Sequence, residues 1–229
     1  MEEKPPGLNV PQAPASLEGS SKRETARLEA RILELEKALE AKEKEIAKMK
    51  ELVVIDDLTQ IRNRRGFSAE AERLTQKMAE DAKIPVERRR NGKLENLTFL
   101  FLDLDDFKQV NDRLGHAAGD ELLKKCAQML SENTRDLDVV ARISGDEFGI
   151  ILIDAETETA TDVAAKLQEQ FLEIEIMGKR VKELFPDVKT GLSIGMASVK
   201  EEGRENVFNP DQLMNLADRA MYQTKKARK

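Results

Sequence analysis

The sequence predicts an α+β domain with a ferredoxin-like antiparallel sheet flanked by helices, preceded by an N-terminal coiled-coil helix. Two observations support this fold class. After a first helix beginning near Gly66, the apolar patterns follow the order strand, helix, strand, strand, helix, strand. That order is the split βαβ arrangement of ferredoxin-like sheets. Before residue 54, apolar residues recur instead at spacings of three and four, as in a coiled coil.

Each element of the expected domain has its own local pattern. Amphipathic spacing predicts helices, whereas short apolar runs bounded by polar residues predict strands. The segment between Lys83 and Asn96 carries three consecutive arginines and Asn91-Gly92, and is expected to be a solvent loop. The expected helices are Gly66–Asp81, Gly119–Asn133, Thr157–Leu172 and Asp211–Ala227, and the expected strands are Leu97–Leu104, the two arms of the hairpin Val140–Leu152, and Lys189–Val199.

The N-terminal part of the chain differs in composition from the rest. Residues 1–20 hold four of the seven prolines, so a disordered tail is expected there. Residues 21–53 carry a heptad pattern that favours a parallel two-stranded coiled coil and hence a homodimer, and residues 54–229 form the remaining domain. The alternative is one amphipathic helix packed on its own domain. The a positions are Thr25, Ile32, Leu39, Ile46 and Val53, and the d positions are Leu28, Leu35, Lys42 and Met49.

The overall composition excludes several classes of protein. Charged residues make up 36% of the 229 residues and the net charge is -6, which argues against nucleic-acid binding because no basic surplus exists. The single cysteine, Cys126, cannot form an intramolecular disulfide, and its position on an apolar helix face predicts a buried thiol. No run has transmembrane length and the N-terminus lacks a signal pattern, so we expect a cytoplasmic protein without a membrane partner.

A predicted hairpin carries the most informative local motif. Two β-rich runs meet at Ser144-Gly145, and Asp146-Glu147 follow at once. Alternating apolar residues around a small dipeptide are typical of a tight β-hairpin turn. Adjacent carboxylates at a hairpin tip cannot both be buried, and at neutral pH they attract a divalent cation. Alone, such a hairpin is usually only a solvated turn, so its interpretation depends on residues elsewhere.

A second group of polar residues follows the expected strand Leu97–Leu104. Carboxylates emerge at its C-terminal end, and a polar loop with two glycine breakers then leads into a helix. Carboxylate, amide and ammonium side chains close together in one short segment are suited to binding nucleotide phosphates and a metal ion. A charged strand-to-helix loop with ordinary caps is an equally open interpretation of this loop alone. The polar residues are Asp103, Asp105, Asp106, Lys108, Asn111, Asp112, His116 and Asp120, with breakers at Gly115 and Gly119.

Five ordered motifs together resemble the GGDEF family of diguanylate cyclases. The resemblance runs from Asp56 to the C-terminus and does not cover the first fifty residues. It implies the palm-type variant of the ferredoxin-like fold. The motifs are DDLTQIRNRRGF (Asp56–Phe67), DLDDFKQVNDRLGHAAGD (Asp103–Asp120), SGDEF (Ser144–Phe148), GLSIGMA (Gly191–Ala197) and ADRAMYQTKKARK (Ala217–Lys229).

The resemblance implies an activity and a set of site residues. The activity is condensation of two GTP molecules into cyclic di-GMP and two pyrophosphates, with two domains face to face. Mg²⁺, or Mn²⁺ in its place, would be the cofactor. By motif, the metal ligands are Asp103, the backbone carbonyl of Leu104, and Asp146; the catalytic residues are Asp146, Glu147 and Lys108; the substrate-binding residues are Asn111, His116, Asp120 and Lys225; and the inhibitory product-binding RxxD pair is Arg135 and Asp138.

Two departures from the family pattern leave a second function open. Ser144 stands where the family usually has glycine, and Lys229 stands where it has arginine. As the first central residue of a type II′ turn, Ser144 would be strained by roughly 1–2 kcal/mol, whereas a type I′ turn would accept a small polar residue there at lower cost. Its side chain is also expected to crowd the phosphates. The main expectation is an active cyclase with product inhibition, and the alternative is a weak or inactive protein that acts as a cyclic di-GMP receptor through Arg135 and Asp138.

Overall fold

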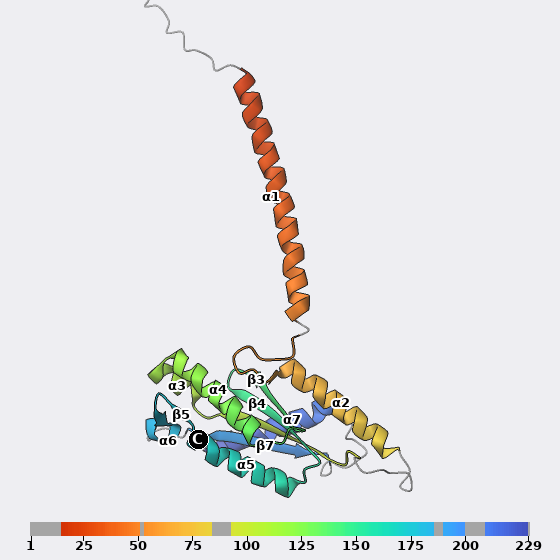
Figure 1. Cartoon of the computed structure of the whole chain (residues 1–229), viewed down its shortest axis with the longest axis vertical. Coiled ribbons are helices and arrows are strands. Elements are labelled where there is room, and N and C mark those ends of the chain that lie inside the picture. Colours follow the sequence, from red (N-terminus) through yellow and green to blue (C-terminus); the bar gives the residue numbers. More distant parts are fainter. Residues whose placement is uncertain (1–14, 51–52, 84–92, 186–189, 200–208, 229) are drawn as a thin grey trace, which may run out of the picture. The chain divides into compact units, whose positions relative to one another are not determined.

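The structure is a computed structural model that describes residues 15–50, 53–83, 93–185, 190–199 and 209–228. The chain divides into two compact units, Met1–Leu52 and Val53–Lys229. The first unit contains helix α1 (Ala15–Lys50), and the second contains all other elements (Figure 1). None of the helices in the described ranges has both the length and the apolar character that a membrane span requires.

Helix α1 is long and has an exposed apolar seam. It begins at Ala15, six residues before the expected start at Ser21. Four residues of the predicted seam, Leu28, Ile32, Leu35 and Leu39, are 54–61% exposed in the single chain. Charged side chains along the helix pair within it, as Arg31 does with Glu34 over 2.7 Å. The helix itself is therefore as expected, and its pairing with a second chain stays a prediction.

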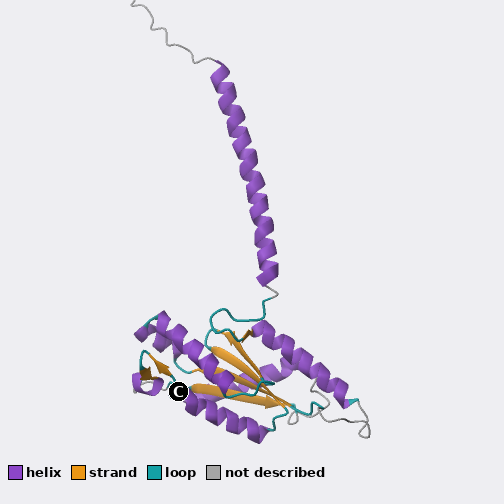
Figure 2. Cartoon of the chain, viewed as in Figure 1, coloured by secondary structure: helices purple, strands orange, loops and turns teal. Residues whose placement is uncertain are grey.

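The second unit is built on one five-stranded sheet with the order β1-β3-β4-β2-β7 (Figure 2). Strand β2 is central and pairs antiparallel with β4 and β7, while β3 pairs antiparallel with β4. This is the strand order of a ferredoxin-like sheet, so the predicted fold class is confirmed. The strands are β1 (Arg62–Asn63), β2 (Leu97–Leu104), β3 (Val139–Ser144), β4 (Glu147–Ile153) and β7 (Leu192–Ser198).

Helices cover both faces of this sheet (Figure 1). Along β2, Phe99 faces one buried cluster together with α2 and α7, whereas Leu100 and Leu102 face another cluster together with α4 and α5. Because side chains alternate along a strand, Asp103 falls on the α2 and α7 face. The helices are α2 (Arg64–Ala82), α3 (Phe107–Leu114), α4 (His116–Glu132), α5 (Thr157–Leu172), α6 (Val181–Leu184) and α7 (Pro210–Arg228).

One predicted loop is wrong. The polar segment after β2 folds as helix α3, and Gly115 with φ +85° separates it from α4. The helix forms because Phe107, Val110 and Leu114 recur at helical spacing and pack on the same cluster, with Val110 fully buried. Two smaller features were also not predicted: β1, which pairs parallel with β3, and the hairpin of β5 (Glu175–Ile176) and β6 (Lys179–Arg180).

Helix α7 lies unusually close to the sheet at Gly195 of β7. A Cβ atom at this position would lie 1.9 Å from the backbone nitrogen of Met221 and 2.3 Å from the carbonyl oxygen of Ala217. Only glycine permits this approach. The close packing fixes how far the C-terminal turns of α7 extend along the sheet, and these turns carry Lys225.

Candidate active site

The pairing of β2 with β4 brings two of the predicted carboxylates together. Asp103 lies directly opposite Glu147 in the antiparallel register, so their side chains share one face of the sheet. Asp146 is in the adjoining turn, where its carbonyl accepts a hydrogen bond of 3.2 Å from the backbone N–H of Leu104. The end of β2 and the hairpin tip are thus joined by backbone, and three predicted site residues lie at this junction.

The hairpin turn differs from the expected one. Ser144 ends β3 and pairs with Glu147, which leaves Gly145 and Asp146 as the central residues. Gly145 has φ +41°, while Ser144 is not among the described non-glycine residues with positive φ. Ser144 is therefore not a central turn residue of either expected turn type and is not strained, because the left-handed position falls on the glycine. The Ser144 hydroxyl instead donates a hydrogen bond to Oε2 of Glu147.

Asp103 is buried and forms an ion pair with Lys225 from α7. Burial raises the pKa of Asp103 above its ordinary value, and repulsion from Asp146 and Asp105 adds to this; the hydrogen bond from Lys225 acts in the opposite direction but does not outweigh them. Burial alone would lower the pKa of Lys225, but the carboxylates around it raise that pKa overall. Lys225 is therefore a fully charged counterion in a region dense in negative charge.

These carboxylates fit a divalent cation by their chemistry. Hard oxygen donors are what Mg²⁺ and Mn²⁺ prefer, and the mutual repulsion around Asp103 is relieved by a positive charge. Within the described residues, however, no three His, Cys, Asp or Glu side chains converge closely enough to form a ready metal site. The Asp103 carboxylate forms its ion pair with the Lys225 ammonium, so the oxygen donors lie near one another without pointing to a common centre.

Apart from Lys225 on α7, the predicted substrate-binding residues lie on α3 and α4, as does the predicted catalytic residue Lys108. Lys108, His116 and Asp120 are exposed, with His116 at the first residue of α4. Asn111 is half-buried and packs against Gly119: a Cβ at 119 would lie 2.0 Å from Oδ1 of Asn111. The missing side chain of Gly119 thus makes the space that the Asn111 amide fills. The sequence indicated Gly119 only as a helix breaker, but it lies inside α4.

The RxxD pair lies in the turn before β3. The Asp138 carboxylate accepts hydrogen bonds of 2.9 Å from the backbone N–H groups of Arg135 and of Ile153. The carboxylate thus binds backbone amides of its own turn and of β4. The Arg135 residue is exposed. Asp138 shapes the turn from which the Arg135 side chain extends.

One interaction that reaches the hairpin turn was not predicted from the sequence. Arg142 on β3 donates from Nε and Nη2 to the carbonyl oxygen of Gly145, over 2.9 and 2.8 Å. Its Nη1 donates to Oδ1 of Asp56 over 3.2 Å. Asp56 also accepts from the backbone N–H and the hydroxyl of Thr59. Arg142 therefore connects the first residues of the domain to the turn that carries Asp146.

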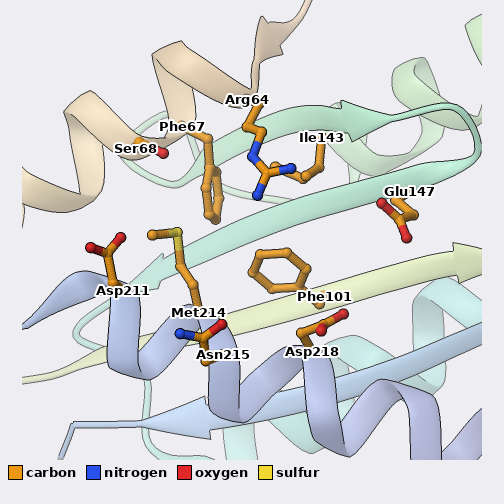
Figure 3. Close-up of a pocket in the computed structure, with 10 residues that line it drawn as sticks. All are labelled: Arg64, Phe67, Ser68, Phe101, Ile143, Glu147, Asp211, Met214, Asn215 and Asp218. Carbon is orange, nitrogen blue, oxygen red and sulfur yellow. The ribbon is translucent and has the colours of Figure 1, made fainter.

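A cavity of about 560 Å³ lies beside the hairpin, between α2, the sheet and α7. Phe67, Phe101, Ile143 and Met214 supply its apolar surface, and Glu147 lies at one end (Figure 3). Gly149 lets the Phe67 and Ile143 side chains pack directly on β4, because a Cβ there would lie 3.0 Å from both. The cavity shows that the Glu147 side chain borders open space on the α2 and α7 face.

Asp56→Asn is expected to destabilise the domain in a pH-dependent way. Burial raises the pKa of Asp56, but the hydrogen bonds of Thr59 and Arg142 outweigh it and lower the pKa below its ordinary value. A lowered pKa stabilises the fold fully above about pH 4, and this stabilisation is lost as the pH falls through the folded value. Urea unfolding should show a loss of about 1–3 kcal/mol at pH 7 that shrinks below about pH 4.

The exposed neighbour Asp57 supplies the control for this prediction. Asp57→Asn should change the free energy of unfolding by no more than about 0.5 kcal/mol at any pH. Equal losses in the two variants, or a loss in Asp56→Asn that is constant from pH 7 to pH 3, would contradict the role of the Arg142 contact.

Comparisons with known proteins agree with this geometry. Residues 53–229 match the family model described as diguanylate cyclase, GGDEF domain. Over 170 residues the chain is 33% identical to the probable diguanylate cyclase DgcT of Escherichia coli. The aligned region covers 74% of this chain and 33% of DgcT. It is 34% identical over 171 residues to the diguanylate cyclase TpbB of Pseudomonas aeruginosa, covering 75% of this chain and 35% of TpbB.

Solved structures give the same result. The GGDEF domain of TpbB superposes with a TM-score of 0.60 at 33% identity, covering 76% of this chain and 89% of that one. The coiled coil and GGDEF domain of DgcB from Caulobacter crescentus, at 20% identity and a TM-score of 0.61, shares the fold over 87% of this chain and 95% of its own. The chain spans about a third of the length of DgcT and TpbB. With the family model matched from residue 53 to 229, this chain belongs to the GGDEF-domain family of diguanylate cyclases.

Proposed function

We propose that this protein is a diguanylate cyclase that condenses two GTP molecules into cyclic di-GMP and releases two pyrophosphates. One observation carries the proposal: the sheet register sets Asp103 opposite Glu147, beside Asp146 and within reach of Lys225. Linking a ribose hydroxyl to an α-phosphate requires carboxylates and cations at one point, because a proton is removed while charge develops on the phosphate. The junction of β2 and the hairpin supplies both.

Two pairs of residues would hold the nucleotide. Asn111 and Asp120 are proposed to bind guanine, since an amide and a carboxylate together match its acceptor and donor edge, whereas adenine presents the reverse pattern. Lys108 and Lys225 would bind the phosphates. Lys225 forms an ion pair with Asp103, and its ammonium would exchange that carboxylate for phosphate oxygens when GTP binds. His116 would lie beside the substrate at the start of α4.

The metal-binding group would be Asp103, the Leu104 carbonyl and Asp146, holding Mg²⁺ or Mn²⁺. When bound, the ions would lower the pKa of the ribose hydroxyl and offset negative charge on the α-phosphate. Glu147, across the sheet from Asp103, would be the auxiliary ligand or the proton acceptor. Arg142 supports this arrangement by fixing the Gly145 carbonyl, which keeps the turn and its carboxylates in place.

A homodimer would bring two such sites together. Each domain would hold one GTP, so a product with two linkages needs two domains face to face. The exposed seam of α1 supports a parallel coiled coil, which would raise the effective concentration of one domain beside the other. Product inhibition at Arg135 and Asp138 is the further part of the proposal, with receptor function at that pair as the second candidate.

Asp146→Asn should abolish most of the synthesis. It keeps the size of the side chain but removes the charge, so turnover of GTP with Mg²⁺ should fall by about a hundredfold or more. Cyclic di-GMP and pyrophosphate are measured by chromatography, and the thermal midpoint checks the fold. Asp162→Asn, at an exposed carboxylate of α5, is the control and should leave turnover unchanged. Near-normal turnover in Asp146→Asn would refute the mechanism.

Gly119→Ala should weaken guanine recognition without unfolding the protein. The new Cβ would overlap Oδ1 of Asn111, the movable end of a side chain, while alanine suits the α4 helix. We expect the KM for GTP to rise by about tenfold and the preference for GTP over ATP to fall, as in Asn111→Ala. In the Asn111→Ala background, Gly119→Ala should have no further effect. Additive losses would show that Gly119 acts by another route.

Leu35→Asp should make activity depend on protein concentration. Leu35 lies at a d position of the predicted seam, so a charge there should separate a parallel dimer. Specific activity should fall by about tenfold at submicromolar protein and recover as the concentration rises. Leu33→Asp is the matched control, because Leu33 is equally exposed (53% against 54%) but lies outside the seam. Sedimentation should show monomers for Leu35→Asp alone; a dimer in both variants would exclude the seam.

Arg135→Ala separates the two candidate functions. For a product-inhibited cyclase, the variant should keep its initial rate and lose inhibition by added cyclic di-GMP. For a receptor, the wild type should bind cyclic di-GMP without making any, and Arg135→Ala should abolish that binding. Arg135 is the residue to change, because Asp138 also accepts two backbone hydrogen bonds and its removal would loosen the turn. Calorimetry and GTP turnover on both proteins give the answer.

A further inference from the structure

We propose that the Ser144 hydroxyl is a positioning group that tethers the Glu147 carboxylate and thereby weakens divalent-cation binding at the hairpin. The inference rests on the proposed function and concerns the regulation of the same site. Its starting point is the one residue of the SGDEF motif that departs from the family pattern. The sequence suggested two effects of Ser144, a strained turn and crowding of the phosphates. Neither involves its hydroxyl.

The tether is a direct hydrogen bond. Ser144 and Glu147 are register partners that close the hairpin turn, so their side chains lie on the same face. The hydroxyl donates to Oε2 of Glu147. Among the residues that the structure describes, Ser144 is the one side chain that hydrogen-bonds to this carboxylate. A glycine at 144 has no group that could do so.

The Glu147 side chain borders open space, so the Ser144 hydrogen bond decides where its carboxylate lies. Figure 3 shows its carboxylate at the end of the cavity, with Arg64 of α2 and Asp218 of α7 on opposite sides of the open space. On the neighbouring strand β2, Asp103 lies opposite Glu147, and the charge of Asp103 is balanced by Lys225. The carboxylate of Glu147 thus has room to adopt other rotamers, and the Ser144 hydroxyl is what holds it against its own hairpin.

A tethered carboxylate is a poorer ligand for a cation. One oxygen already accepts a hydrogen bond, and that bond must be broken or bent for the carboxylate to turn toward Asp103. A net hydrogen bond of ordinary strength corresponds to a change of about three- to tenfold in a binding constant. Ser144 would therefore raise the Mg²⁺ or Mn²⁺ concentration at which the site fills, relative to a glycine at the same position.

Three substitutions distinguish the hydroxyl from the bulk of the side chain. Ser144→Ala removes only the hydroxyl, Ser144→Gly removes the whole side chain, and Ser144→Thr keeps the hydroxyl. If the tether operates, the Ala and Gly variants behave alike and the Thr variant resembles the wild type. If crowding of the phosphates operates instead, none of the three substitutions changes the affinity for a cation in the absence of nucleotide, because no phosphate is then present to be crowded.

The direct measurement is Mn²⁺ binding by calorimetry to the full-length chain without nucleotide. We expect Ser144→Ala and Ser144→Gly to bind Mn²⁺ about three- to tenfold more tightly than the wild type, with Ser144→Thr unchanged. In a Glu147→Gln background the Ala substitution should have no effect, since residue 147 is then a neutral amide and no longer an anionic ligand for the cation. An unchanged affinity in Ser144→Ala, a change in Ser144→Gly alone, or no measurable Mn²⁺ binding by any variant would overturn the tether.

The catalytic readout keeps this inference separate from the proposed function. With GTP, the Mg²⁺ concentration giving half-maximal rate should fall in Ser144→Ala, while the KM for GTP at saturating Mg²⁺ stays unchanged. If no variant makes cyclic di-GMP but the Mn²⁺ affinities shift as expected, the tether holds and the cyclase proposal fails. If turnover is normal and the affinities do not shift, the cyclase proposal holds and the tether fails.

Discussion

The antiparallel pairing of β2 with β4 is the constraint on which the rest of the site depends. It runs from Leu97 opposite Ile153 to Asp103 opposite Glu147, and its apolar residues belong to the two buried clusters or pack against them. Because side-chain direction alternates along a strand, a slip of one residue would turn Asp103 toward α4 and bury a charge among leucines. The register that fills the core is therefore the register that places the carboxylates.

Helix α7 completes this arrangement from the other side. Its backbone contacts Gly195 with no room for a side chain, and from there the helix continues toward the end of β2 that carries Asp103. A lysine on a loosely packed helix would spread its charge over many positions. Here the close packing places Lys225 beside a single buried carboxylate, and the ion pair balances the charge of that carboxylate.

The backbone of the hairpin tip is held by contacts that do not use its carboxylates. Arg142 binds the Gly145 carbonyl and reaches Asp56 at the beginning of the domain, while the Leu104 amide binds the Asp146 carbonyl. The carboxylate of Asp146 and one oxygen of Glu147 remain available for chemistry. A fixed backbone with movable carboxylates suits the proposed site, in which Asp103 would bind a metal ion in place of Lys225 and Lys225 would bind phosphate.

The sequence by itself determined the kinds and order of the elements, because apolar periodicity is local. It predicted Leu97–Leu104 and Thr157–Leu172 to the residue, and it identified the acidic motifs. Helix α3 was missed because its three apolar residues stand among polar ones. Only the tertiary structure decided that Asp103 meets Lys225 122 residues away, that Arg142 meets Asp56 86 residues away, and that Ser144 binds Glu147 instead of occupying a strained turn. Such contacts depend on strand register and helix docking, which the whole core fixes and no local pattern encodes.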